Sequence, residues 1–396
     1  RTGTVTDLIS GSQIITFTNS SPAMGFNSSG VLVQPTANVP FIEYDPATGA
    51  CLGWRVWDGV TNLKSYSEAV LVANGYGATN ATLATQSVST PIQGVSSASF
   101  FALNSGANTG NNTDGMSYGS SISLANSTAY TQSALFKLSG TNTIRLRSNV
   151  TGQVFDIVPA SGATTPTGTI TACTVQAAPN GWYRVSWSFT STTSAPGNRG
   201  DHWTIKTPVA DGTTGLWITG TQINTGPLAP YVPTGALTAS STADVASITG
   251  AAFAGIWNPN EATFFSDTEV ASTSQAEQTC PSVNDGTSAN RMDLRVVGAS
   301  PTMAKAVFVA GAVSQGVLTV TVPDQKRRLS ALAMKVNDSR LQCGSAGANG
   351  NPSALPVVDR MYINFSTGAF ETIGYIREMG LFKSRRPNAN LQAMMQ

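Results

Sequence analysis

Short segments in which apolar and polar residues alternate recur along this chain, and this period of two most constrains its fold. The clearest is Gly181–Phe189 (GWYRVSWSF). In an extended chain, successive side chains point to opposite sides. One side here holds Tyr183, Val185, Trp187 and Phe189, and the other holds Trp182, Arg184, Ser186 and Ser188. This pattern predicts a strand whose first side faces a core.

Similar segments lie on both sides of a proline-rich stretch, Gly226–Gly235. They are Thr143–Ser148, Val154–Val158, His202–Lys206 and Leu216–Ile223 before it, and Ala262–Phe265, Arg291–Val297, Ala304–Val309, Val317–Val322, Ser330–Val336, Arg360–Phe365 and Gly374–Phe382 after it. Only Pro387–Gln396 has helical spacing. Many short strands with almost no helix predict an all-β fold of two tandem β-sandwiches and a short C-terminal helix.

The boundaries follow from the prolines and from the start of the chain. Because proline cannot sit inside a sheet ladder, we place one boundary near residue 236. The first 64 residues hold only brief apolar alternations, so we expect them to pack on the next domain or on another subunit. The predicted divisions are an extended N-terminal attachment segment (1–64), a first sandwich (65–235) and a second sandwich (236–396).

Composition excludes several kinds of function. Charged residues make up 11% of the chain and its net charge is +1, so an overall electrostatic drive towards nucleic acid is lacking. No segment has the roughly 18 consecutive apolar residues of a membrane span. The one histidine, His202, rules out a multi-histidine zinc site. Because no motif marks a pair of catalytic carboxylates either, we expect no enzyme activity.

The four cysteines are far apart in the sequence and form no CxxC pair. They are Cys51, Cys173, Cys280 and Cys343. The first interpretation is four free thiols, and a disulfide between Cys280 and Cys343 is the alternative.

Sugar sites stack an apolar sugar face on an aromatic ring and bind hydroxyl groups with a few polar side chains. Six tryptophans are available: Trp54, Trp57, Trp182, Trp203, Trp217 and Trp257. The candidate glycan or interface contacts are Trp182, Arg184, Trp203 and Trp57. The alternative is that these residues cover a second layer of the fold or a subunit interface.

No cofactor is expected, with calcium as the exception left open. Loops at Asn284–Asn290 and Asn111–Asp114 carry the oxygen ligands that Ca²⁺ prefers. Turns in which Asp or Asn bonds its own backbone need no metal, and they explain the same residues.

Three parts of the chain resemble bacteriophage tail-fibre and head-spike proteins. In the first, Phe41–Glu68, an aromatic–Asp–Pro–x–Thr–Gly turn precedes a Leu-Gly strand and then Thr-Asn-Leu and Tyr-Ser-Glu. This order is similar to a leader of such proteins. Here Trp57-Asp58-Gly59-Val60 replaces the usual acidic, Gln- and Arg-containing stretch.

The second and third parts resemble jelly-roll domains of the same proteins. The stretch from about 70 to 249 looks like a concanavalin-like or carbohydrate-binding-module jelly roll. It carries Gly181–Ser186, Gly220–Ile223, Tyr231–Gly235 and Ala243–Ile248. The stretch from about 250 to 396 is similar to a laminin-G-like jelly roll, through Glu261–Phe265, Ala331–Lys335 and Ile376-Arg377.

The resemblance implies a non-enzymatic virion structural protein, a fibre or spike at the particle surface. Its expected partners are copies of itself, as a trimer, other virion proteins, and host surface glycans. Neither nucleic acid nor membrane is expected as a partner. The alternatives are a capsid decoration or head-fibre protein without a receptor role, and a cell-surface or secreted carbohydrate-binding protein.

Overall fold

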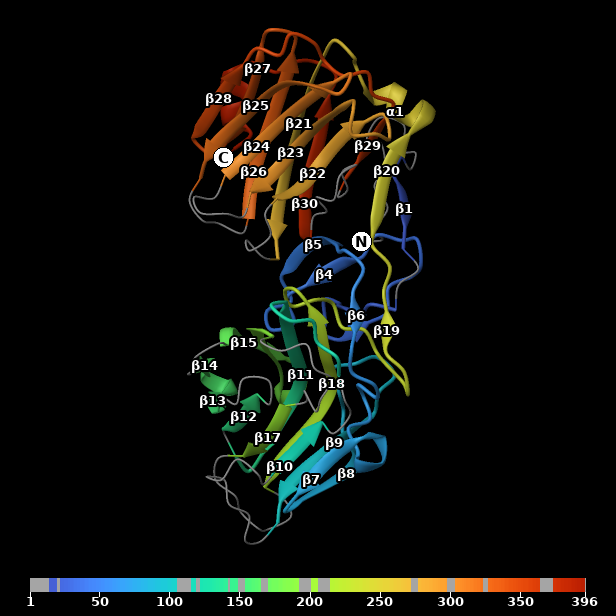
Figure 1. Cartoon of the computed structure of the whole chain (residues 1–396), viewed down its shortest axis with the longest axis vertical. Helices are drawn as coiled ribbons and strands as arrows, with labels where there is room; N and C mark the ends of the chain where they lie inside the picture. The colour runs from blue at the N-terminus through green and yellow to red at the C-terminus, as the bar shows by residue number, and fades with distance from the viewer. Residues whose placement is uncertain are drawn as a thin grey trace.

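Four large sheets, stacked in two pairs, form the architecture of this computed structural model (Figure 1). The structure describes residues 14–19, 22–104, 115–118, 122–141, 143–148, 154–164, 170–191, 201–205, 214–271, 277–297, 303–322, 327–363 and 373–395. The chain is all-β, with two jelly-roll sandwiches, as the sequence predicts. The first sandwich is the lower body in Figure 1 and the second is the upper.

Two six-stranded sheets make the first sandwich. Sheet 1a has the order β14 (Ala163–Thr164), β13 (Val154–Val158), β12 (Ile144–Ser148), β17 (Asp201–Ile205), β10 (Gly115–Tyr118) and β7 (Tyr76–Thr79). Sheet 1b has the order β15 (Ile170–Ala178), β16 (Trp182–Thr190), β11 (Ala129–Ser139), β18 (Gly215–Thr225), β9 (Ser97–Leu103) and β8 (Ala81–Ser87).

Two seven-stranded sheets make the second sandwich. Sheet 2a has the order β1 (Thr16–Thr18), β20 (Val245–Thr249), β29 (Arg360–Tyr362), β22 (Glu277–Asn284), β23 (Arg291–Val297), β24 (Met303–Ala310) and β25 (Val313–Thr321). Sheet 2b has the order β28 (Ala346–Gly350), β27 (Ser339–Cys343), β26 (Arg327–Lys335), β21 (Glu261–Val270), β30 (Gly374–Phe382), β5 (Cys51–Val56) and β4 (Ile42–Tyr44).

Each sandwich has its own apolar core. In the first, Trp187 and Phe189 of β16 pack with Phe136 of β11 and with Ile144 and Ile157 of sheet 1a. This is the face that the alternation in Gly181–Phe189 predicts. The second core includes Phe264, Met292, Phe308, Leu332 and Leu341.

The N-terminal segment contributes to both sandwiches. Its strand β1 pairs with β20, and β5 pairs with β30, so both extend sheets of the second sandwich. Between them, the hairpin of β2 (Gly25–Phe26) and β3 (Leu32–Val33) lies over the outer face of sheet 1b, in a cluster with Leu135 and Trp182. The described strands of residues 1–64 thus pair outside sheets 1a and 1b, although their hairpin packs on sheet 1b.

The chain enters the sheets of the first sandwich and leaves them at one place. β6 (Thr61–Asn62) and β19 (Ala239–Ser240) pair there as a two-stranded ribbon, and Figure 1 shows them side by side between the two bodies. Because β1, β4 and β5 precede this ribbon and β20 follows it, the first sandwich is an insertion within the second.

Few residues are helical. Helix α2 (Asn388–Ala393) confirms the predicted C-terminal helix, whereas α1 (Gly250–Ile256) was not predicted. Three short 3₁₀ turns occur at Val72–Asn74, Pro159–Ser161 and Pro179–Gly181. In the described part of the chain, no helix has the length and apolar character needed to span a membrane.

The cysteines are free thiols, so the alternative disulfide between Cys280 and Cys343 is wrong. Both side chains are buried in the core of the second sandwich. Each sulfur instead accepts a hydrogen bond from a hydroxyl group, Cys280 from Thr268 and Cys343 from Ser330.

Candidate functional site

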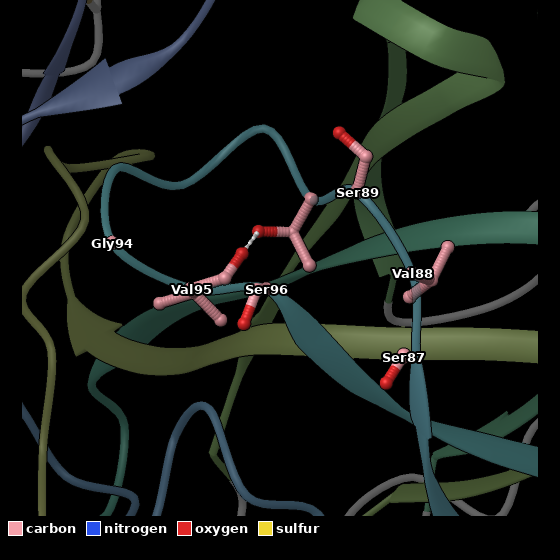
Figure 2. Close-up of a pocket in the computed structure, with 7 residues that line it drawn as sticks. Ser87, Val88, Ser89, Gly94, Val95 and Ser96 are labelled. Carbon is pink, nitrogen blue, oxygen red and sulfur yellow. Dashed lines mark hydrogen bonds between the residues drawn. The ribbon is translucent and has the colours of Figure 1, made fainter.

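A groove of about 600 Å³ opens where the chain turns from β8 to β9 (Figure 2). Its lining carries hydroxyl groups and two small apolar side chains but no charge. The lining residues are Ser87, Val88, Ser89, Thr90, Gly94, Val95 and Ser96. Ser87, Ser89, Gly94 and Ser96 are exposed, so solutes can reach the groove from solvent.

Neighbouring elements hold the groove in shape. The hydroxyl of buried Thr90 donates a hydrogen bond to the carbonyl of Val95, which ties the two sides of the turn together. The indole Nε1 of Trp182 donates to the carbonyl of Ser89 over 2.8 Å. On the other side, the amide of Leu32 donates to the carbonyl of Pro91 over 2.7 Å.

A half-buried tryptophan, Trp217 of β18, lies next to this turn. Its ring centroid is 5.0 Å from that of Phe100, its neighbour on β9. Its Nε1 donates to Oε1 of Gln86 over 3.1 Å, and Nζ of Lys137 lies 5.9 Å from the ring centroid. Lys137 forms no ion pair within the described part of the chain.

The indole and the groove belong to one surface. Gln86 immediately precedes Ser87 of the groove, and Val88, Val95 and Trp217 pack on the same apolar cluster. We call Trp217, Gln86 and Lys137 the indole platform. A ring, an amide and an ammonium can together offer stacking to an apolar sugar face and hydrogen bonds to its hydroxyl or carboxylate groups.

Two of the sequence candidates lie on the covered face of sheet 1b instead. Trp182 is 0% exposed. The alternation allowed its side chain to face solvent, but the β2–β3 hairpin covers this face of the sheet. Arg184 is partly buried and donates to the carbonyl of Ala229 over 2.9 Å. Burial lowers the pKa of the Arg184 guanidinium, and nearby Glu43 opposes that shift.

The other two candidates have different positions. Trp57 is half-buried at the boundary between the sandwiches, against the cluster of Val60, Ala229 and Val232. Trp203 lies in β17 opposite Met116 and Leu146, and its side chain is outside the described residues, as is that of His202. The structure thus places Trp57 against a cluster that includes Ala229, the residue to which Arg184 donates, and leaves Trp203 on the other sheet.

Sequence reasoning counted Trp217 only as one of six available tryptophans, and it missed Gln86 and Lys137. The three residues lie on three strands, β18, β8 and β11. Alternation within Leu216–Ile223 could have placed Trp217 on the opposite face from the core residues Leu216 and Ile218. The partners could not be found, because strand order is not a local property of the sequence.

A group of buried charges lies where the N-terminal segment meets both sandwiches. Arg55 of β5 donates to the carbonyls of Met24 (2.7 Å) and Ala23 (3.2 Å) and lies 3.8 Å from a carboxylate oxygen of Glu43. Burial raises the pKa of Glu43, against the opposing effect of Arg55. These bonds go to backbone groups within the chain, so the group serves as a structural joint.

Asp244 belongs to the same joint. Its carboxylate accepts hydrogen bonds from the side-chain amide of Asn19 and, over 2.9 Å, from the backbone amide of Trp57. Burial raises its pKa from 3.8 to about 6. Asp244, which follows β19 in the chain, thereby binds two residues that precede β6.

The calcium loop at Asn284–Asn290 forms an internally bonded turn. The Asp285 carboxylate accepts bonds from the amide of Thr287 (2.8 Å) and from the side chain of Asn290 (2.9 Å). Desolvation raises the pKa of Asp285, but these bonds, together with one from the Thr287 hydroxyl, outweigh it and lower the pKa below its usual value. Asn111–Asp114 lies outside the described residues, and within them no cluster of three His, Cys, Asp or Glu side chains suits a metal ion.

No protein-family model matches the chain, and no curated protein sequence matches it. Solved structures with a similar fold include carbohydrate-binding modules and laminin G domains. The CBM40 of the Ruminococcus gnavus IT-sialidase, bound to α2,3-sialyllactose, is 18% identical over 36% of this chain and 86% of its own, with a TM-score of 0.32. The CBM22-1–CBM22-2 tandem of Paenibacillus barcinonensis Xyn10C is 10% identical over 83% and 99%, with a TM-score of 0.26. Domains LG4-5 of the mouse laminin α1 chain are 9% identical over 65% and 84%, with a TM-score of 0.23.

Proposed function

We propose that this chain is a non-enzymatic fibre or spike protein of a bacteriophage particle that contacts glycans on the host surface. The observation that carries the glycan contact is the indole platform beside an uncharged, hydroxyl-lined groove. Aromatic rings and hydrogen-bonding groups, rather than a strong electrostatic field, are what a sugar ring requires.

The particle role is supported by the sequence resemblance in Phe41–Glu68 and in both sandwiches. The long, two-bodied shape in Figure 1 suits a protein that projects from a particle.

Genes for capsid, portal and tail proteins beside this one would support the proposal. If labelling of intact particles marks only capsid faces, the protein is a head fibre or decoration protein. A gene among host surface proteins would favour a secreted or cell-surface binding protein.

The glycan contact is tested on an array of host polysaccharide fragments with the full chain. We expect specific binding that Trp217→Ala weakens by about tenfold or more, because the stacking surface is lost. Lys137→Ala should weaken binding only if the bound sugar carries a carboxylate or sulfate group. Circular dichroism would confirm that the variants fold.

Trp57→Ala tests a second half-buried tryptophan, whose role as a contact is still a prediction. If Trp217→Ala binds the glycan as the parent does and Trp57→Ala does not bind it, the glycan site lies at the boundary between the sandwiches and not at the indole platform. Release of oligosaccharide from the polysaccharide would contradict the non-enzymatic part of the proposal.

A further inference from the structure

The outer strand of sheet 1b, β8, is an edge that no described segment covers or protects in the usual ways. Natural sheets guard exposed edges with lysine, proline, bulges or a covering segment, because free backbone groups template pairing with other chains. β8 (ATLATQS) contains neither charge nor proline, and its pairing with β9 runs from Ala81–Leu103 to Ser87–Ser97 without a register shift. Five of its residues are exposed: Thr82, Ala84, Thr85, Gln86 and Ser87.

The other long edges differ from β8. β15 and β25 each have nine residues, but both carry a register shift in their pairing. β28 has five residues, and its Gly350 lies against Leu318 of β25. Within the described chain, β8 is therefore the longest edge strand with regular pairing.

The register shows which backbone groups of β8 point outward. The amide of Val88 donates to the carbonyl of Ser96, and the amide of Asn104 donates to the carbonyl of Asn80. In an antiparallel pair, hydrogen-bonded positions alternate, so even-numbered residues of β8 bond to β9. Ala81, Leu83, Thr85 and Ser87 accordingly direct their amide and carbonyl groups away from the sheet.

We infer that β8 is the surface through which two copies of this chain associate, by antiparallel pairing of one β8 with the other about Ala84. In this register Ala81 faces Ser87 of the second copy and Leu83 faces its Thr85, so all the outward groups pair. No charges oppose each other, because residues 69–113 carry none. A two-fold axis would make the contact self-complementary, which gives a dimer instead of the trimer that the sequence resemblance implies.

This association goes beyond the proposed glycan contact and can fail independently of it. A two-fold axis through an antiparallel strand pair runs perpendicular to the sheet, so both copies would present their indole platforms on the same side. A second copy is the occupant favoured over an unrelated peptide, because uncharged, small side chains suit their own copies and offer no charge for a partner to recognise.

Cysteine crosslinking tests the register. In a Cys51→Ser background, which removes an exposed thiol, Ala84→Cys places two thiols opposite each other at a non-hydrogen-bonded position. With oxidised glutathione, this variant should form a reducible dimer. Thr82→Cys, on the same strand and face, should give no more crosslinked dimer than the Cys51→Ser parent, because residue 82 faces Gln86 of the other copy. Mixing Thr82→Cys with Gln86→Cys protein should restore crosslinking.

Sedimentation velocity of the uncrosslinked protein tests the association itself. We expect a concentration-dependent dimer. Ala84→Lys should raise its dissociation constant by about tenfold or more, because two ammonium groups would meet at the axis. Thr82→Lys is the matched control and should have a smaller effect. A parent that stays monomeric at every concentration overturns the inference, and so does an oligomer that Ala84→Lys leaves unchanged and Ala84→Cys does not crosslink.

Discussion

Asp244 shows how one buried residue can make the joint between the sandwiches sensitive to pH. Its pKa is raised to about 6 by burial, whereas an aspartate in an unfolded chain titrates near 3.8. Between these values the folded chain holds a proton that the unfolded chain releases. The contribution of Asp244 to the free energy of unfolding is therefore present below about pH 4 and falls as the pH rises to about 6.

Asp244→Asn should remove this dependence. The stability of the parent relative to the variant should fall by up to about 3 kcal/mol between pH 4 and pH 6.5, and then stay constant. Urea unfolding of both proteins at several pH values measures the difference. Burial also raises the pKa of Glu43 and of Glu68, but both proteins carry these residues, so their contributions largely cancel in the difference. A difference that is the same at every pH would show that Asp244 does not titrate in this window.

Residue identity alone predicted part of the candidate site. The alternation around Trp187 correctly assigned that ring to the core, since it is 1% exposed. The same alternation placed Trp182 on the opposite face and left open whether it is exposed or covers a second layer of the fold. It is covered, because a distant hairpin packs on that face. Whether the second face of a sheet is covered depends on other segments, which the strand's own pattern does not describe.

At the scale of elements, strands β13, β23 and β30 have the predicted bounds, Val154–Val158, Arg291–Val297 and Gly374–Phe382. β11 was missed. It lies at the centre of sheet 1b, and residues from Tyr130 to Phe136 are buried on both of its faces. Burial on both faces removes the alternation that identifies a strand next to solvent.

Gly374, at the start of β30, has a backbone conformation and a close neighbour that only glycine accommodates. Its φ of +150° is a region that other residues rarely adopt, and a Cβ there would overlap the carbonyl of Glu269 on β21. Gly374→Ala should lower the free energy of unfolding by about 1–3 kcal/mol.

The control is Gly255→Ala in α1, where a Cβ meets nothing within 4 Å. Alanine favours a helix by up to about 1 kcal/mol over glycine, so this substitution should stabilise the protein. Urea unfolding measures both changes, and the same sign for the two variants would contradict the argument.

At the scale of the whole molecule, Arg55 connects a strand of the second sandwich to the segment that covers the first. Arg55→Ala would remove the ion pair of buried Glu43 and two hydrogen bonds to backbone carbonyls. We expect a loss of about 3–5 kcal/mol, with faster amide hydrogen exchange in both sandwiches. Arg377→Ala breaks a half-exposed ion pair with Glu269 and should cost about 1 kcal/mol or less. Faster exchange in the second sandwich alone would contradict the role of Arg55 as a joint.

The pairing of β1 with β20 could not be predicted, because these strands are separated by more than two hundred residues and neither carries a distinctive pattern. Described residues of the N-terminal segment pack in clusters with residues of both sandwiches. Its distribution over two sandwiches is a property of topology.

The insertion of one sandwich within the other also sets an order of assembly during protein synthesis. Strands β1, β4 and β5 leave the ribosome first, but their partners β20 and β30 come after the whole first sandwich. Joining β5 to β30 across an unstructured loop on the order of 300 residues would cost about 3 kcal/mol more than across a loop of about 10 residues. If the inserted sandwich has already folded, its two ends are held together at β6 and β19, and this entropy has been lost before the last strands arrive.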